Sequence, residues 1–191
     1  MNLLRTVKKE IRILGLDCAK VPRAKGHVAQ IVGVIYRGGR WLDGVVTVDV
    51  ETDKVDATEK IARMILTSVH YGQLRIVMLS DIALAGRNLV DIKELCERTH
   101  LPAMVVKEQA PTLKEMRKMR EKFRHCNVRK RALENAGAIL PIKRRSGRTL
   151  YVQFQGLSRS DVEKALDVSC SGRIPEPLRV ARLIASALER I

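Results

Sequence analysis

The chain has 191 residues, of which 46% are hydrophobic and 30% are charged, so it is long enough for one compact core and is not a wholly disordered chain. Lys and Arg total 36 against 21 Asp and Glu, which gives a net charge of +15 and indicates a polyanionic partner. No apolar run approaches the length of a membrane span and no signal peptide is recognisable, so we expect a cytoplasmic protein without membrane contact.

The first part of the chain predicts three strands. Residues 11–17 and 28–36 are short apolar runs, and residues 41–50 largely alternate between apolar and polar positions, which is typical of strands. A loop is expected over residues 18–27. The adjacent glycines at 38–39 allow the positive φ values of a tight turn, so strands two and three should form an antiparallel hairpin.

The hydrophobic period then changes. Residues 56–71 place apolar side chains at helical spacing, whereas residues 74–79 are almost continuously apolar, as in a strand buried on both faces. Residues 89–96 repeat the helical spacing, and residues 103–106 follow as a fifth strand. A strand-helix-strand order of this kind predicts parallel neighbours in the sheet.

The last part of the chain predicts helices and a late hairpin. Pro111 opens a helix, and a second helix follows it and stops at Gly137. Residues 139–142 and 149–154 flank a basic turn, Ser158 begins a short helix, and Pro177 begins the last one.

We therefore expect an α/β fold in a single domain spanning residues 1–191, with three antiparallel strands, then β-α-β, flanking helices and a late β-hairpin. This is the element order of a ribonuclease H-like mixed sheet. The alternative, a doubly wound parallel sheet, requires crossover helices between the first strands, where the connections are too short.

Positive charge is concentrated in one stretch. Residues 107–148 hold 14 Lys and Arg against 4 acids, while residues 41–106 have a net charge of −3. Clustered cations release condensed counterions when they neutralise phosphates, which favours nucleic acid as the partner over two solvated helix faces and a basic loop. The residues assigned to this contact are Lys118, Lys122, Arg129, Lys130, Lys143, Arg144, Arg145 and Arg148.

A few acids stand where a sheet would gather them. Asp17 closes the first strand and Asp81 follows the fourth, and parallel neighbours would bring these two ends together. Carboxylates from separate strand ends can hold Mg²⁺ for phosphoryl transfer. We assign Asp17 and Asp81 as candidate catalytic residues and metal ligands, with Asp91 as a further ligand. The alternative readings are strand-end turn residues for Asp17 and Asp81, and a helix start for Asp91.

Other patterns favour structural roles. The spacing of Asp56 and Glu59 matches a helix N-terminal capping arrangement better than a metal site. Asp43 can point to either face of its strand, and Trp41 is expected in the core. The four histidines lack metal-ligand spacing, the four cysteines form no C-x-x-C pair, and no G-x-S-x-G segment is present, so triad hydrolases and structural zinc sites find no support.

Longer blocks of the sequence resemble a known family. I-L-G-L-D at 13–17, V-G-V-I-Y-R-G-G-R-W-L-D-G at 32–44, D-A-T-E-K-I at 56–61 and V-M-L-S-D-I-A-L-A-G-R-N-L-V-D-I at 77–92 are similar to the archaeal domain-of-unknown-function 99 family. The resemblance covers most of residues 11–140. It implies a ribonuclease H-like fold related to endonuclease V, a Mg²⁺-dependent enzyme that cuts nucleic acid near deaminated bases.

The resemblance also implies residue roles. Asp17 matches the first metal-binding acid of the endonuclease V pattern. The second acid of that pattern follows strand four directly, where this chain has Ser80, and Asp81 stands one place later. Cys18 occupies a position where relatives commonly have another acid. Because a shift of one residue at a strand end turns a side chain toward the other face, the resemblance implies the fold more strongly than the activity.

Three interpretations follow from these observations. The first is a nucleic-acid-binding protein with an endonuclease V-like fold and possible Mg²⁺- or Mn²⁺-dependent phosphodiester hydrolysis. Its endonuclease site would use Asp17 and Asp81, with Asp91 or Glu59 as a third ligand. The alternative is a non-catalytic nucleic-acid-binding module with a degenerate metal site. The third is a protein-interaction scaffold whose charge serves solubility. The sequence does not distinguish DNA from RNA as the partner, and it does not define an oligomeric state.

Overall fold

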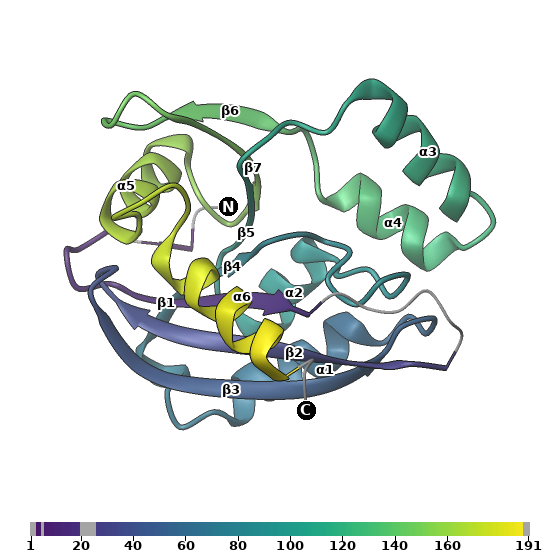
Figure 1. Ribbon diagram of the computed structural model, residues 1–191, viewed down its shortest axis with the longest axis horizontal. Helices are drawn as coiled ribbons and strands as arrows, with labels where there is room; N and C mark the ends of the chain where they lie inside the picture. Colours follow the sequence, from purple (N-terminus) through teal and green to yellow (C-terminus); the bar gives the residue numbers. More distant parts are fainter. Residues whose placement is uncertain (1–2, 5, 20–25, 189–191) are drawn as a thin grey trace.

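The centre of the molecule is a seven-stranded sheet (Figure 1). The computed structural model describes residues 3–4, 6–19 and 26–188. The strands are β1 (Arg12–Cys18), β2 (Val28–Arg37), β3 (Trp41–Glu51), β4 (Leu74–Leu79), β5 (Ala103–Lys107), β6 (Leu140–Lys143) and β7 (Thr149–Gln155). Their order across the sheet is β3-β2-β1-β4-β5-β7-β6. The sheet is mixed, because β1, β4 and β5 run parallel while all other neighbours are antiparallel.

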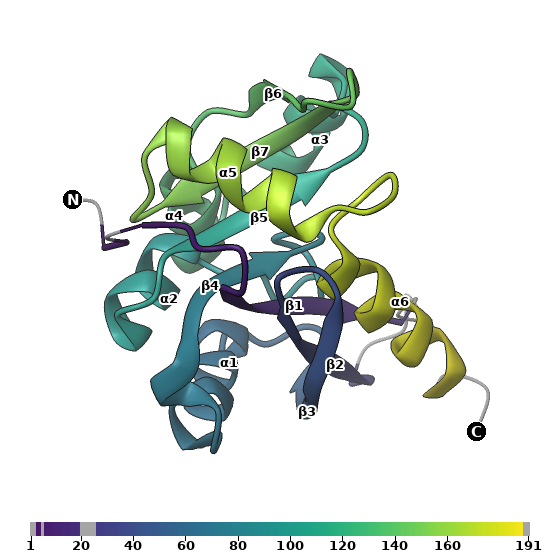
Figure 2. The same ribbon diagram turned by 90° about the vertical axis from the view of Figure 1, so that its left-hand side faces the viewer.

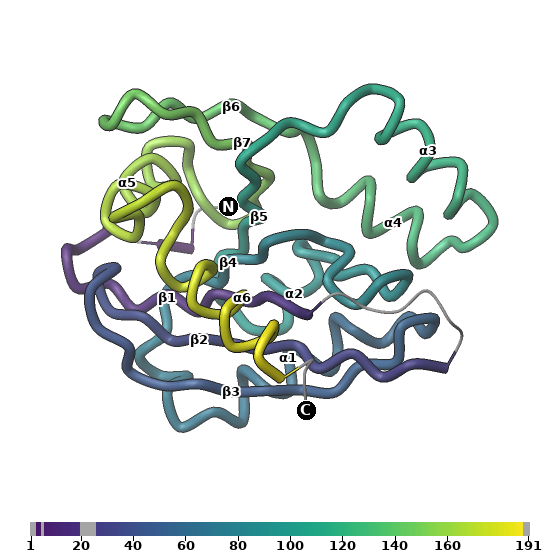
Figure 3. Tube along the Cα trace, viewed as in Figure 1, coloured from purple at the N-terminus to yellow at the C-terminus, as the bar shows by residue number. Residues whose placement is uncertain are grey.

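Within the described residues, six α-helices flank this sheet. They are α1 (Ala57–Thr67), α2 (Ile92–Thr99), α3 (Leu113–Phe123), α4 (Asn127–Asn135), α5 (Arg159–Ser169) and α6 (Glu176–Leu188), with a short 3-10 turn, η1 (Tyr71–Gln73), before β4. The Cα trace shows α3 and α4 as a helical hairpin that projects from the side of the molecule on which β1 ends (Figure 3).

Alternation along the strands divides the core between the two faces of the sheet. Leu14 and Leu16 of β1 pack with α1 and α2 on one face. Ile13 faces the other side, where the core includes residues of α5 and the first turn of α6. Figure 2 shows α1 and α6 on opposite sides of β1. Side chains on β1 therefore alternate between the α1 and α6 faces, and this alternation decides what surrounds the strand ends.

The predicted fold class and strand pairing are confirmed. Strands β2 and β3 form the expected antiparallel hairpin, in which Gly38 and Gly39 have φ values of +57° and +66°. The parallel arrangement of β1, β4 and β5 is as predicted, and the late hairpin is present as β6 and β7. All four cysteines are free thiols, as expected. Among the described residues, no helix is long and apolar enough to cross a membrane.

Several local expectations differ from the structure. The helix expected over 56–71 ends at Thr67, and the helix expected from residue 89 begins only at Ile92. Pro111 precedes α3 without entering it, because Thr112 is the N-cap and forms a capping box. Trp41 was expected in the core, but it begins the edge strand β3 and is 60% exposed. The loop predicted over 18–27 lies mostly outside the described residues.

Candidate functional site

Asp17 lies at the end of β1, beside the end of β4. The two strands are parallel neighbours and Leu16 pairs with Leu79, so the residues that follow them come close together. The Ser80 hydroxyl donates a hydrogen bond of 2.7 Å to Asp17 Oδ1, and the backbone N–H of Cys18 donates to the same oxygen at 2.8 Å. The side chain that reaches Asp17 from the end of β4 is therefore a neutral hydroxyl.

The second carboxylate oxygen of Asp17 faces α6. Arg182 Nε lies 3.1 Å from Asp17 Oδ2. The side chain of Asp17 is only 9% exposed, whereas that of Arg182 is 53% exposed. The carboxylate is thus buried beneath a guanidinium that still reaches solvent.

A glycine allows α6 to lie close to β1. A Cβ atom at Gly15 would lie 2.4 Å from the carbonyl carbon of Pro177, far inside van der Waals contact. In the first turn of α6, burial alone would raise the pKa of Glu176, but hydrogen bonds from Arg179 and Ser171 together outweigh it and hold that pKa below its ordinary value. These contacts fix the start of the helix that carries Arg182.

Asp81 faces the other side of the sheet. Its Oδ2 atom lies 2.6 Å from Lys107 Nζ, and its Oδ1 atom accepts a hydrogen bond of 3.2 Å from the Ala83 N–H. Consecutive residues of an extended chain point to opposite faces, so Ser80 takes the side of Asp17 and Asp81 takes the side of Lys107. The structure does not bring the carboxylates of Asp17 and Asp81 together.

A pocket of about 100 Å³ lies next to Asp81. Met116, Met119 and Arg120 of α3 and Leu133 of α4 contribute to its lining. The α3–α4 hairpin therefore packs against the loop that follows β4, close to the strand end that carries Ser80.

Asp91 caps a helix instead of facing Asp17. Its Oδ1 atom accepts hydrogen bonds from the backbone N–H groups of Lys93 and Glu94, both at 3.1 Å, and its Oδ2 atom accepts from Asn135 Nδ2 at 2.8 Å. The residue is only 3% exposed. These side-chain contacts of Asp91 stabilise the start of α2 or tie it to α4, which is the helix-start alternative.

The capping arrangement expected at Asp56 takes another form. Asp56 holds the N-cap position of α1 without a side-chain capping bond. Asn88 supplies that bond instead, since its Oδ1 atom accepts from the Ala57 N–H at 2.9 Å. The Asn88 amide also donates to the Glu51 carbonyl at 2.8 Å and to Asp56 Oδ1 at 2.7 Å. Asn88 is fully buried and joins β3 to α1, a role that the sequence pattern did not indicate.

The side chains around Asp17 do not fit a divalent metal ion. Mg²⁺ and Mn²⁺ prefer several oxygen ligands, commonly including more than one carboxylate. Across the described part of the chain, no three Asp, Glu, His or Cys side chains form a group that could hold an ion. Ser80 adds no negative charge, Arg182 places a positive charge beside the carboxylate, and Glu59 is exposed on α1, which covers the other face.

The α3–α4 hairpin is rich in exposed positive charge. Residues 113–135 contain nine Lys and Arg and three Glu. Lys122 lies over the ring of Phe123 at 5.0 Å, and Lys130 is 3.9 Å from Glu134. Four cations of α3 are exposed and have no side-chain hydrogen bond or ion pair with any described residue: Lys114, Arg117, Lys118 and Arg120.

Arg129 is engaged within the protein. Its guanidinium donates hydrogen bonds to the carbonyl oxygens of Arg87 at 2.8 Å, Lys54 at 3.2 Å and Asp53. These bonds fasten α4 to the turn after β3 and to the loop after β4. The Arg129 guanidinium, which the sequence pattern assigned to nucleic acid, therefore holds the hairpin in place.

The basic turn between β6 and β7 is separate from the hairpin. Arg144 is 8% exposed and donates to the carbonyls of Gly172 and Cys170, so it anchors the turn to the segment before α6. Arg145 pairs with Asp167 at 3.1 Å. Lys143 and Arg148 are exposed, but Figure 1 shows this turn at the left and the α3–α4 hairpin at the right. The basic segment 107–148, which the sequence analysis assigned to nucleic-acid contact, is thus divided between two sides of the molecule.

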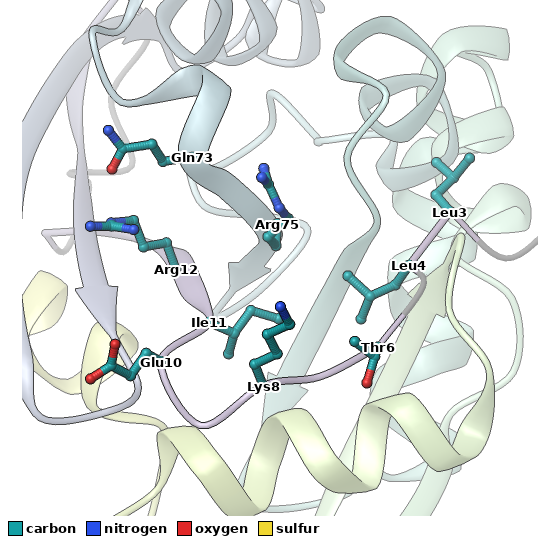
Figure 4. A pocket seen from close by; sticks show the side chains of 9 residues that line it. All are labelled: Leu3, Leu4, Thr6, Lys8, Glu10, Ile11, Arg12, Gln73 and Arg75. Atoms are coloured by element: carbon teal, nitrogen blue, oxygen red, sulfur yellow. The ribbon is translucent and has the colours of Figure 1, made fainter.

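A larger, open pocket of about 680 Å³ lies at the beginning of β1 and β4. Figure 4 shows Leu3, Leu4, Thr6 and Lys8 along one side of it, and Arg12, Gln73 and Arg75 along the other. Arg12 is paired with Asp43 at 2.8 Å, and Arg75 donates to backbone carbonyls. Because β1 and β4 are parallel, this pocket and Asp17 lie at opposite ends of these strands.

The sequence analysis did not single out Arg182. Residues 178, 181, 184, 185 and 188 explained the last helix as a packing element, and Arg182 was absent from its stripe. The sequence offers one indication of its role: Arg182 directly follows Ala181, a residue of the apolar stripe that is buried. An arginine at such a position extends along the boundary between core and solvent.

The chain is similar to proteins of known sequence and structure. A family model described as endonuclease dU matches residues 9–189. A UPF0215 protein of Methanothermobacter thermautotrophicus is 42% identical over 187 residues, covering 96% of this chain and 90% of that protein. A protein of unknown function from Archaeoglobus fulgidus has a crystal structure with a TM-score of 0.80 and 32% identity, covering 94% of this chain and 98% of the other.

The fold is also similar to that of endonuclease V. The crystal structure of the Ciona intestinalis enzyme, in complex with a DNA that contains an inosine, has a TM-score of 0.61 and 13% identity. The match covers 95% of this chain and 87% of that one. At this level of identity the likeness concerns the fold.

Proposed function

Because this chain belongs to the endonuclease dU family, we propose that it is a nucleic-acid-binding protein whose main contact surface is the α3–α4 hairpin. One observation carries the proposal: the exposed face of α3 holds cations without partners among the described residues. These cations are Lys114, Arg117, Lys118 and Arg120. Solvated helices usually mix charges of both signs, whereas an unpaired cationic face suits a phosphate backbone.

The position of this face supports the same proposal. The hairpin adjoins the loop after β4, and Ser80 at the start of that loop contacts Asp17. A strand of nucleic acid along α3 would therefore pass near the ends of β1 and β4. The endonuclease V of Ciona intestinalis binds DNA that contains a deaminated base, and the family description names deoxyuridine. DNA that contains a deaminated base is accordingly the substrate class that we assign.

Fluorescence anisotropy with a labelled DNA oligonucleotide tests the binding surface. The variant combines Lys114→Gln, Arg117→Gln and Lys118→Gln, which removes three exposed charges without touching the core. Each lost phosphate contact should reduce the slope of log K against log salt by about 0.7 for single strands and about 0.9 for duplexes. We expect weaker binding and a slope that is shallower by roughly 2 to 3 for the triple variant.

A charge-matched control separates local contact from net charge. Arg63→Gln, Lys93→Gln and Lys164→Gln remove three exposed cations from α1, α2 and α5. This control should retain most of the wild-type affinity and slope. Equal losses in the two triple variants would refute a contact surface on α3, and no binding near physiological salt would refute the proposed function as a whole.

A metal-dependent endonuclease is the second candidate, favoured by the family description and by the place of Asp17 at the end of β1. Its candidate residues remain Asp17 and Asp81. Incubation of deoxyuridine-containing or inosine-containing DNA with Mg²⁺ or Mn²⁺ tests it. Cleavage that is lost in Asp17→Asn would support this candidate, whereas binding without cleavage supports a module whose metal site has been lost.

The broader expectations stay proposals as well. The strand order of β1 to β5 supports a ribonuclease H-like assignment. The continuous sheet, which joins strands from both halves of the chain, supports a single domain over residues 1–191. We retain the cytoplasm as the place of action on the basis of composition.

A further inference from the structure

We infer that the Arg182 guanidinium takes the place of a metal ion at Asp17, so that this site holds a phosphodiester group of nucleic acid without any divalent cation. The inference rests on the proposed nucleic-acid binding and specifies how the strand ends take part in it. It also explains why an acid-poor site stands at a position where the sequence resemblance implies a metal.

The first support is that the protein already provides partners for the carboxylate. Asp17 Oδ1 accepts from the Ser80 hydroxyl and from a backbone N–H, at 2.7 and 2.8 Å. Asp17 Oδ2 lies 3.1 Å from Arg182 Nε. A charge-assisted hydrogen bond of this kind places a positive charge beside the carboxylate, as a metal ion would, but the charge belongs to a side chain of the protein.

The second support is electrostatic. A divalent ion bound to Asp17 would stand next to the permanent positive charge of Arg182, and among the described residues no second carboxylate contacts Asp17 to offset the repulsion. The nearest acid along β4, Asp81, points to the opposite face and is paired with Lys107 at 2.6 Å. Ser80, at the position where the family pattern has an acid, and Arg182 therefore both lower the affinity of this site for a metal ion.

The third support is that Arg182 retains free donors. Among the described residues, its hydrogen bond to Asp17 uses Nε, and its two Nη atoms have no partner. The side chain is 53% exposed, so these nitrogens are accessible from solvent. A guanidinium with free Nη atoms can donate two parallel hydrogen bonds to a phosphate, and it neutralises the phosphate charge. It cannot supply the metal-bound water that metal-dependent hydrolysis of a phosphodiester uses.

Metal binding gives a test that does not depend on nucleic acid. Titration of the purified protein with Mn²⁺, followed by electron paramagnetic resonance, should show no stoichiometric site in the low-millimolar range. Stoichiometric Mn²⁺ binding that disappears in Asp17→Asn would overturn the inference. The double variant Ser80→Asp, Arg182→Gln removes both obstacles and should gain a Mn²⁺ site; failure to gain one in a folded double variant would also overturn it.

Binding of DNA tests the positive part of the inference. At equal ionic strength, the wild-type affinity should be the same in EDTA and in Mg²⁺. Arg182→Gln should weaken binding about tenfold, while Arg182→Lys, which keeps the charge, should retain part of the affinity. Arg159→Gln on α5 is the control with an equal charge change and should bind like the wild type.

The outcomes distinguish the two proposals. If the wild type binds DNA and the α3 triple variant binds weakly, but Arg182→Gln binds like the wild type, the role of Arg182 is refuted and the α3 surface stands. If the wild type binds no nucleic acid, the proposed function fails, and with it the phosphodiester role. The Mn²⁺ titration still decides whether Arg182 replaces a metal.

Discussion

The packing of α6 on β1 can be tested by adding one methyl group. Gly15 lies on the same face of β1 as Asp17, and a Cβ at this position would lie 2.4, 2.6 and 2.7 Å from three atoms of Pro177. Two of these three atoms belong to the backbone of α6, so no side-chain rotation can relieve the contact. Gly15→Ala should therefore push the helix away from the strand.

The size of the effect follows from these distances. Ordinary contact begins at 3.4 Å, so the closest pair must separate by about 1 Å. Overpacking of this kind costs about 1–3 kcal/mol, and the lower backbone entropy of alanine in the unfolded chain offsets about 0.5–1 kcal/mol of it. We expect a net loss of about 1–2 kcal/mol in the free energy of unfolding, with a fall in Tm of about 2–4 °C for each kcal/mol.

Urea denaturation followed by circular dichroism measures this loss, and Gly72→Ala provides a matched control. A Cβ at Gly72 meets no atom within 4 Å, so the control should stay within about 0.5 kcal/mol of the wild type. Equal stability of Gly15→Ala and Gly72→Ala would refute the close docking of α6. Because α6 carries Arg182, Gly15→Ala should also weaken DNA binding, in the direction expected for Arg182→Gln.

Two further predictions concern buried polar groups. Hydrogen bonds from Arg179 and Ser171 hold the pKa of Glu176 below its ordinary value, although burial opposes them. The ionised form of Glu176 therefore stabilises the fold at pH values above its pKa in the unfolded state. This stabilisation is lost as the pH falls through its pKa in the folded state. Between pH 7 and pH 3 the wild type should lose more unfolding free energy in urea titrations than Glu176→Gln, and parallel pH profiles would contradict this. Asn88→Ala removes three hydrogen bonds, one of them with the buried Ala57 N–H, and should cost about 2–4 kcal/mol in the same assay. The exposed substitution Asn127→Ala should cost under about 0.5 kcal/mol, and a similarly small loss for Asn88→Ala would contradict its structural role.

The elements that depend on local pattern could be predicted from the sequence. The apolar run 74–79 coincides with β4, and the glycines at 38–39 fixed the β2–β3 turn, because both signals lie within a few adjacent residues. Helix ends were predicted less well. The start of α2 depends on the cap at Asp91, and the first N–H of α1 is bound by Asn88, which is 31 residues away in the sequence from Ala57. The insertion of β7 between β5 and β6 also escaped prediction, since alternation shows that a strand exists and not which neighbours it pairs with.

For the site, the sequence predicted which strand ends meet but not what occupies them. The meeting of the β1 and β4 ends followed from the strand-helix-strand order. The opposite orientations of Ser80 and Asp81 depend on where extended backbone ends after Leu79, and boundaries are the least certain part of any pattern. Arg182 is 165 residues from Asp17, so no local spacing connects them. The division of the basic segment between two sides of the molecule was not predicted either. Counting charges along the sequence does not show that Arg129 and Arg144 bind backbone carbonyls.

The contact between Asp17 and Arg182 has a consequence for the order in which the molecule is completed. A ribosome makes β1 among the first elements and α6 after every other helix described above, and contacts between such distant segments form slowly because a long loop must close. Until α6 docks, the Asp17 carboxylate lacks its counter-ion and the apolar residues of β2 that α6 covers are open to water. Interruption of synthesis before residue 176 would leave a nascent chain with an uncovered sheet, the kind of surface that chaperones hold.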